Sequence, residues 1–244
     1  MITVRPLTLS LLLVMIAIVL ILASILSTYL GTVTIENQPF VDIRKIYIRL
    51  FELNGEANIP TWFSSLLLIL NAFILATIAI RTKAQQGPYY TQWFVLAAIF
   101  LYLSIDESAQ LHEMVEKPVR LAFDLSGYLY FAWIIPAVCC LIVLSVYIRR
   151  FLFDLPKSTR WLFLFAGAVY VGGAVGMEAI GSKIFYTHQG HKTMAYNLWA
   201  TVEESFEMLG LIIFFYALLN YVAQNMPEII FFVKKSESSS ALGE

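Results

Sequence analysis

Acidic residues stand inside strongly apolar sequence at three places in the chain. One is the segment SIDESAQLHE, which follows the apolar run FVLAAIFLYL; another is TVEESFEMLG; the third is the single glutamate of VGMEAIG. An ionised carboxylate in hydrocarbon is costly unless it is paired, and such residues usually mark functional sites. Carboxylates together with histidine suit Fe, Mn or Zn. The candidate ligands of a divalent metal are Asp106, Glu107, His112, Glu178, Glu203 and Glu207.

The candidate ligands are compatible with two kinds of metal site, one with two irons and one with a single zinc. Di-iron carboxylate bundles use about four carboxylates and two histidines, which this chain can provide, although no Glu-x-x-His spacing occurs in it. Two irons would oxidise a C–H bond, whereas one zinc would activate a water to hydrolyse an ester or amide, with a glutamate as base. We favour two metals, because the carboxylates outnumber the needs of a zinc site. Three histidines in all exclude the histidine-box membrane oxygenases. The candidate catalytic residues are Glu204 and Glu113.

A second set of residues resembles a known group of hydrolases. Ser108-x-x-x-His112, followed by Asp124, is similar to the Ser-x-x-x-His and Asp motifs of the alkaline ceramidase and adiponectin-receptor group. The resemblance would imply one bound zinc. The chain departs from that pattern in its last helix, which has Glu203-x-x-x-Glu207 instead of His-x-x-x-His, and it lacks a seventh span. The resemblance therefore does not establish membership.

The composition identifies what must position these residues. The chain is 59% hydrophobic and 14% charged, against about 25% charged residues in soluble domains, so it is predicted to be an all-α, polytopic membrane helix bundle. A span needs about 20 apolar residues. Six such stretches occur, at residues 7–30, 61–80, 89–111, 128–147, 161–181 and 196–222. We expect one transmembrane domain over residues 1–236, in a bacterial-type inner or plasma membrane.

The remaining segments are polar. Residues 31–59 form an extramembrane segment in which VDIRKIYIRLFEL has helical amphipathic spacing, with a short strand at IYIRLF as the alternative. Residues 237–244 are predicted to be disordered. The adjacent Cys139 and Cys140 are interpreted as packing residues. The net charge of −1 makes nucleic acid an unsuitable partner.

The basic residues predict how the bundle is oriented. Lys and Arg in short loops favour the cytoplasmic side, which gives an N-in, C-in topology. It places on the inner side nine of the sixteen Lys and Arg, namely Arg5, Arg81, Lys83, Arg149, Arg150, Lys157, Arg160, Lys234 and Lys235. The third and fifth spans then run outward and the sixth runs back from the same face. The acids of all three spans therefore lie in one leaflet, whichever way the bundle is inserted.

Helical geometry raises a problem within the third span. At about 100° per residue, Asp106 shares a stripe with Gln110 and Glu113, whereas His112 faces roughly the opposite way. A regular helix cannot present all of these residues to one point. Either His112 serves another partner, or the helix unwinds near it before Pro118.

Several of these residues also have structural interpretations. Glu203 can favour the start of a helix, Glu178 can pair with Lys183, and His188 and His191 can be surface loop residues. Our leading hypothesis is an integral membrane enzyme with a carboxylate and histidine metal site near one membrane face. Its partners would be membrane lipids and a lipophilic small molecule, which it would oxidise or hydrolyse. The alternatives are a proton- or cation-coupled transporter or channel that uses the same acids, and an assembly subunit whose acids pair with a partner.

Overall fold

The computed structural model describes residues 5–33, 38–55 and 57–226, and this part of the chain is helical without any strand. IYIRLF lies in a helix, and the predicted tail at 237–244 falls outside the described residues, as do Lys234 and Lys235. The elements in chain order are α1 (Pro6–Thr32), α2 (Gln38–Phe51), α3 (Ile59–Ala84), α4 (Tyr90–Ala109), α5 (Leu111–Phe123), the 3₁₀ turn η1 (Gly127–Leu129), α6 (Ile134–Asp154), α7 (Lys157–Val171), the π-helical η2 (Gly172–Met177), α8 (Glu178–Thr187) and α9 (Met194–Asn225).

The helices confirm a multi-pass membrane helix bundle. Five are long and apolar enough to cross a membrane, namely α1, α3, α6, the continuous helix from α7 through η2 to α8, and α9. The bent pair of α4 and α5 supplies a sixth if it is taken as one span. The fold class predicted from composition is therefore correct, whereas the N-in, C-in topology stays a prediction.

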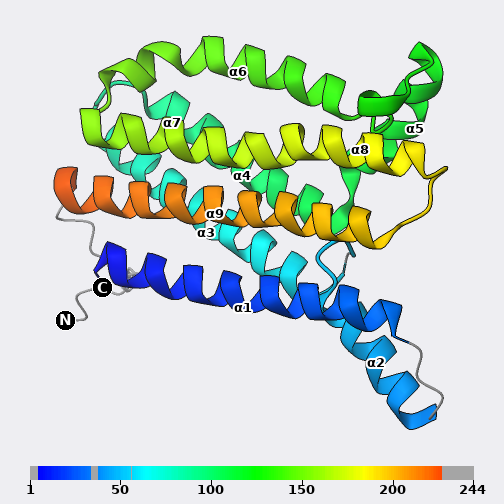
Figure 1. Cartoon of the computed structure of the whole chain (residues 1–244). Coiled ribbons are helices and arrows are strands. Elements are labelled where there is room, and N and C mark those ends of the chain that lie inside the picture. Colours follow the sequence, from blue (N-terminus) through cyan, green and yellow to red (C-terminus); the bar gives the residue numbers. More distant parts are fainter. Residues whose placement is uncertain (1–4, 34–37, 56, 227–244) are drawn as a thin grey trace, which may run out of the picture.

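Consecutive spanning helices run in alternating directions, and α9 lies in the middle of the bundle (Figure 1). It packs against α1, α3, α7 and η2, while α3 packs against α4 along its length. α2, α5 and the connection from α8 to α9 lie at one end, which we call the acidic end. The starts of α1 and α7 and the ends of α6 and α9 lie at the other, which we call the basic end.

Two apolar clusters fill the bundle. The cluster toward the basic end is built around Trp93, Phe151, Phe163 and Phe214 of four different helices. The other joins α1, α3 and α9 through residues such as Leu67, Met208 and Leu211. The outward faces of α1 and α6 are apolar and exposed, as expected of surfaces that face lipid tails.

The third predicted span differs most from the structure. Residues 89–111 were expected to form one helix, but α4 ends at Ala109 and α5 starts at Leu111 at an angle of 79° to it. The break is at Gln110, whose φ of 55° is left-handed, a conformation that interrupts a right-handed helix. Pro118 lies inside α5 and does not cause the break.

The next two spans are also displaced from their predicted limits. The fourth begins at Ile134 and ends at Asp154, because residues from Gly127 onward first form a short turn. The fifth is longer than predicted and runs from Lys157 to Thr187. Its middle widens into the π-helical η2, GGAVGM, immediately before Glu178. Such π segments often occur at functional sites.

Candidate functional site

The break between α4 and α5 folds His112 back onto Asp106. The main-chain N–H of His112 donates to Oδ1 of Asp106 at 2.8 Å, and its ring Nδ1 lies 2.9 Å from Oδ2. Asp106 thereby caps an N–H at the start of α5, as side chains commonly do at helix N-termini. Of the two alternatives for His112, the structure has the one in which the helix unwinds near this residue.

Serine side chains hold the end of α4 against the start of α3. The Ser65 and Ser104 hydroxyls lie 2.9 Å apart, and the Ser108 hydroxyl donates to that of Ser65 at 3.0 Å. Small hydroxyl residues let membrane helices approach closely and bond across the interface. Ser108 is thus a contact between helices in this structure, and Asp124 lies exposed at the end of α5.

Trp133 links the histidine to the next acid. Its ring packs against that of His112 with centroids 4.9 Å apart, and its Nε1 donates to Oε1 of Glu178 at 3.3 Å. Glu178 therefore accepts from an indole and does not pair with Lys183, whose ammonium lies over the rings of Tyr128 and Tyr186. The segment before α6 thus connects α5 with α8.

The π-helical turn brings Glu178 against α9. Gly173 of η2 contacts α9 so closely that an added Cβ would lie 3.0 Å from the Glu203 carbonyl oxygen and 3.1 Å from Cγ of Glu207. The indole of Trp199 donates to the Met177 carbonyl at 2.8 Å. In this arrangement Glu178 and Glu203 lie close enough for their charges to act on each other.

Glu207 lies one turn further along α9. Its carboxyl group lies near the Tyr170 hydroxyl, and it interacts electrostatically with Glu107, Glu178 and Asp106. Close approach of α7 and α9 makes this possible, because a Cβ on Gly210 would lie 2.7 Å from both the backbone nitrogen and Cβ of Tyr170. Acids of α4, α8 and α9 thus influence one another at the acidic end.

The two residues predicted to be catalytic occupy different surroundings. Glu204 is partly exposed and interacts with its neighbour Glu203 and with Tyr170. Glu113 is exposed in the first turn of α5, where its charge acts on His112. Glu204 therefore belongs to the interacting acids, whereas Glu113 lies at their solvent-exposed edge.

The side chains form pairs and not a metal-ligand shell. Among the described residues, no three His, Cys, Asp or Glu side chains converge in a way that could hold a metal ion. The donor set predicted from the sequence therefore does not fit a metal ion in the positions that its side chains occupy, and the metal stays a prediction. His188 lies apart, since its Nδ1 bonds the Ile184 carbonyl oxygen at 2.8 Å, and His191 is exposed.

Trp133 and Tyr170 are contacts of the site that the sequence did not reveal. Aromatic residues are common in membrane helices, so neither stands out by type. A buried indole or phenol usually needs a hydrogen-bond partner, and this rule is the only indication that the sequence offers for Trp133 and Tyr170. The rule does not predict which acid is the partner.

The comparisons with known proteins concern the family and not the activity. No curated protein matches the chain, and no solved structure matches it. One family model, described as a domain of unknown function (DUF8692), matches residues 11–222. This match covers the helices that carry the acids on α4, α8 and α9. The chain belongs to the DUF8692 family.

Proposed function

We propose that the protein is an integral membrane enzyme that performs acid–base chemistry on a lipid or another lipophilic molecule at the acidic end of the bundle. The observation that carries the proposal is the pair of hydrogen bonds that joins Asp106 to His112 across the break between α4 and α5. Gln110 holds an uncommon left-handed conformation to allow it. Strained backbone of this kind is concentrated at functional sites.

The hydrogen bonds assign a role to each group of the pair. With Asp106 accepting at Nδ1–H, the neutral imidazole of His112 keeps Nε2 as its acceptor. A carboxylate that orients a histidine in this way is a recurring feature of general bases. His112 would take a proton from water or a substrate hydroxyl through Nε2, and Asp106 would stabilise the imidazolium that forms.

The neighbouring acids supply a second protonable group. Glu178 and Glu203 repel each other when both are ionised. A proton on one of them would relieve that repulsion and could be delivered to a leaving group. Trp133 lies between this pair and His112, in contact with both sides. The proposed base, His112, and the proposed acid, the glutamate pair, would thus lie on the two sides of the Trp133 indole.

The surroundings favour a lipophilic substrate. α5 exposes apolar side chains at Met114, Val115 and Leu121. α6 is in contact with the bundle mainly through η2 at this level, so the region next to Trp133 borders lipid. A substrate dissolved in the bilayer would reach the site without crossing water. We place the protein in a bacterial inner membrane or a plasma membrane.

The predicted metal forms a separate part of the proposal. A divalent ion among the acids would supply a Lewis acid or an activated water. Because the side chains do not form a ligand shell here, no step above depends on one. The steps assigned to His112 and Asp106 require only their own hydrogen bonds.

The test compares lipids of the organism that carries the chain. A deletion strain would be complemented with wild-type protein, with His112→Gln, or with Asp124→Asn, which changes an exposed acid at the same end. We expect untargeted mass spectrometry of lipid extracts to show a species that depends on the wild-type and Asp124→Asn proteins and is lost with His112→Gln. Restoration by His112→Gln, or an unchanged lipid profile on deletion, would overturn the proposal.

Proteoliposomes separate this function from the alternative one. The other end of the bundle is filled by the apolar cluster around Trp93 and Phe151, and the described acids of α4, α8 and α9 do not extend into it. We therefore expect liposomes with purified protein and an internal pH dye to show no proton or cation flux above empty liposomes. Flux that Glu207→Gln abolishes would support the transporter instead.

A further inference from the structure

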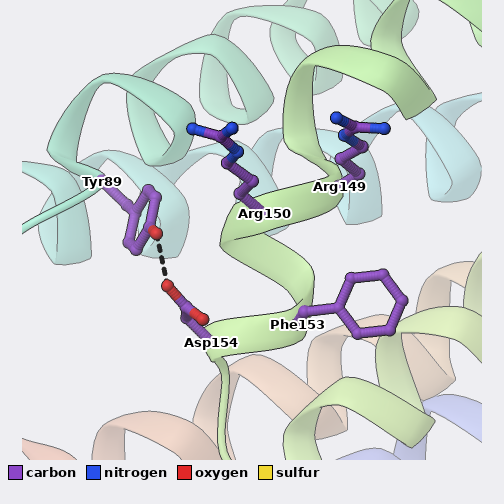
Figure 2. Close-up of a pocket in the computed structure, with 5 residues that line it drawn as sticks. All are labelled: Tyr89, Arg149, Arg150, Phe153 and Asp154. Carbon is purple, nitrogen blue, oxygen red and sulfur yellow. Dashed lines mark hydrogen bonds between the residues drawn. The ribbon is translucent and has the colours of Figure 1, made fainter.

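A basic pocket lies at the end of the bundle opposite to the acids. It has a volume of about 420 Å³ and is lined by Tyr89, Arg149, Arg150, Phe153 and Asp154 (Figure 2). Tyr89 precedes α4, and the other four residues belong to the last turns of α6. Ligand pockets of this size are about 300–1,000 Å³, so it can take a headgroup-sized molecule.

The end of α6 is fixed in place by Phe151. This residue is 1% exposed, and its ring packs edge-on against Trp93 with centroids 4.7 Å apart and against Tyr89 at 5.9 Å. Arg150 and Asp154 are four residues apart and therefore neighbours on one face of the helix. Figure 2 shows both on the side of Tyr89, while Phe153 points away from them.

Asp154, the acidic residue of the pocket, already has a hydrogen-bond partner. The Tyr89 hydroxyl donates a short hydrogen bond to the Asp154 carboxylate, which raises the pKa of Tyr89 above its usual value. Tyr89 has a left-handed φ of 65°, an uncommon conformation for a bulky residue. Within the described part of the chain, no hydrogen bond or ion pair joins either Arg149 or Arg150 to another residue. In Figure 2 the Arg150 guanidinium lies toward Tyr89, whereas that of Arg149, the preceding residue, lies on the side of Phe153.

The surface of α6 next to this pocket is apolar and exposed. Directly before the arginines, α6 exposes Ile142, Val143 and Val146 by 59%, 69% and 63%. An acyl chain lying along these residues would bring its headgroup to the guanidinium groups. Basic pockets at the ends of membrane helices bind anionic lipid headgroups in this way. Arginine is well suited to this role, because its fork can bond two phosphate oxygens at once.

We propose that the pocket of Tyr89, Arg149, Arg150, Phe153 and Asp154 binds the phosphate of an anionic phospholipid whose acyl chains lie against α6. The hydrogen bond from Tyr89 keeps the Asp154 carboxylate away from the guanidinium groups, so that the phosphate is their partner. Soluble phosphate shares the headgroup chemistry but gains nothing from the apolar face of α6. The site is separate from the acids of the proposed enzyme and does not depend on them.

The experiment measures lipid binding to the full-length protein in detergent. Native mass spectrometry would compare phosphatidylglycerol with phosphatidylcholine for the wild type and for Arg149→Gln/Arg150→Gln. A basic residue near a lipid surface contributes about 1 kcal/mol, so we expect the double variant to lose about 30-fold in affinity for phosphatidylglycerol. Phosphatidylcholine binding should be weaker in the wild type and unchanged in the variant.

Two further variants separate a pocket from general surface charge. Lys83→Gln/Lys157→Gln removes the same charge from the same end but touches none of the lining residues, and it should bind lipid as the wild type does. Tyr89→Phe keeps every charge but frees Asp154 to pair with an arginine, so it should weaken phosphatidylglycerol binding. Size-exclusion profiles identical to the wild type would show that each variant is folded.

Three results would overturn the proposal. One is equal retention of phosphatidylglycerol by the wild type and the arginine variant. A second is an equal loss in the lysine variant, which would show a diffuse charge effect. A third is complete displacement of the lipid by millimolar inorganic phosphate, because a free anion would then be the ligand.

Discussion

His112 and Asp106 are joined by two hydrogen bonds although the helix that carries Asp106 has already ended between them. The carboxylate accepts from the main-chain N–H of His112 with one oxygen and contacts Nδ1 with the other, at 2.8 and 2.9 Å. One side chain therefore both starts α5 and orients the imidazole. The local fold and the proposed chemistry depend on the same carboxylate.

Replacing Asp106 should separate these two roles. Asp106→Ala loses both hydrogen bonds and leaves an uncapped N–H at the start of α5, for which we expect a loss of about 1–2 kcal/mol in the free energy of unfolding. Asp106→Asn should lose less, because its amide oxygen can still accept from the main chain of His112. Denaturant titration in detergent measures both, and hydrogen exchange should localise the change to α5. Equal losses in the two variants would contradict the capping role.

Contact between α7 and α9 should depend on the absence of a side chain at Gly210. A Cβ there would lie 2.7 Å from the backbone nitrogen of Tyr170, and backbone cannot move aside as a flexible side chain can. We expect Gly210→Ala to destabilise the protein by about 1–3 kcal/mol. Gly167→Ala is the matched control on α7, since a Cβ at Gly167 would meet nothing within 4 Å. Thermal unfolding in detergent compares the two, and equal stability would contradict the close packing.

The fold was predictable because the bilayer imposes one rule on every span. About 20 apolar residues and internally bonded backbone suffice to predict a helix, and the six apolar stretches correspond to helices of the structure. The limits were less predictable where local events intervene. Neither the left-handed Gln110 nor the π turn before Glu178 follows from hydropathy.

The candidate site was predictable in part for a related reason. Helix direction alone placed the acids of three spans toward one end, and Glu207 does interact with Asp106 and Glu178 there. Direction does not determine side-chain partners. The bond from Trp133 to Glu178 depends on how the segment before α6 folds, and no residue spacing encodes that contact. The predicted limits of the fourth span placed Trp133 inside a helix, where it would have had a different orientation.

The indole of Trp133 should contribute through its N–H as well as its ring. Trp133→Phe keeps an aromatic ring against His112 but removes the donor to Glu178. We expect a loss of about 0.5–1.5 kcal/mol in the free energy of unfolding, typical of one hydrogen bond in a membrane protein. Trp161→Phe is the control, because Trp161 is 67% exposed on the lipid face and its loss should be nearly neutral. A costly Trp161→Phe and a neutral Trp133→Phe would contradict the assignment.

Metal content is decided by elemental analysis of protein purified without added metal. The interacting acids repel one another when ionised, and protons or a divalent ion relieve that repulsion. The acids and the histidine of the sequence predict at least one Fe, Mn or Zn ion per chain. We expect Glu207→Gln to lose this ion, because Glu207 interacts with acids of both α4 and α8. Asp124→Asn should keep it, since Asp124 is an exposed acid at the end of α5 and Asn tolerates its left-handed φ of 50°. Binding would require the side chains of Glu178 and Glu203 to turn toward the ion, because they form no ligand shell where they lie. Wild-type protein that contains no metal would contradict the prediction and leave shared protons as the means by which these acids coexist.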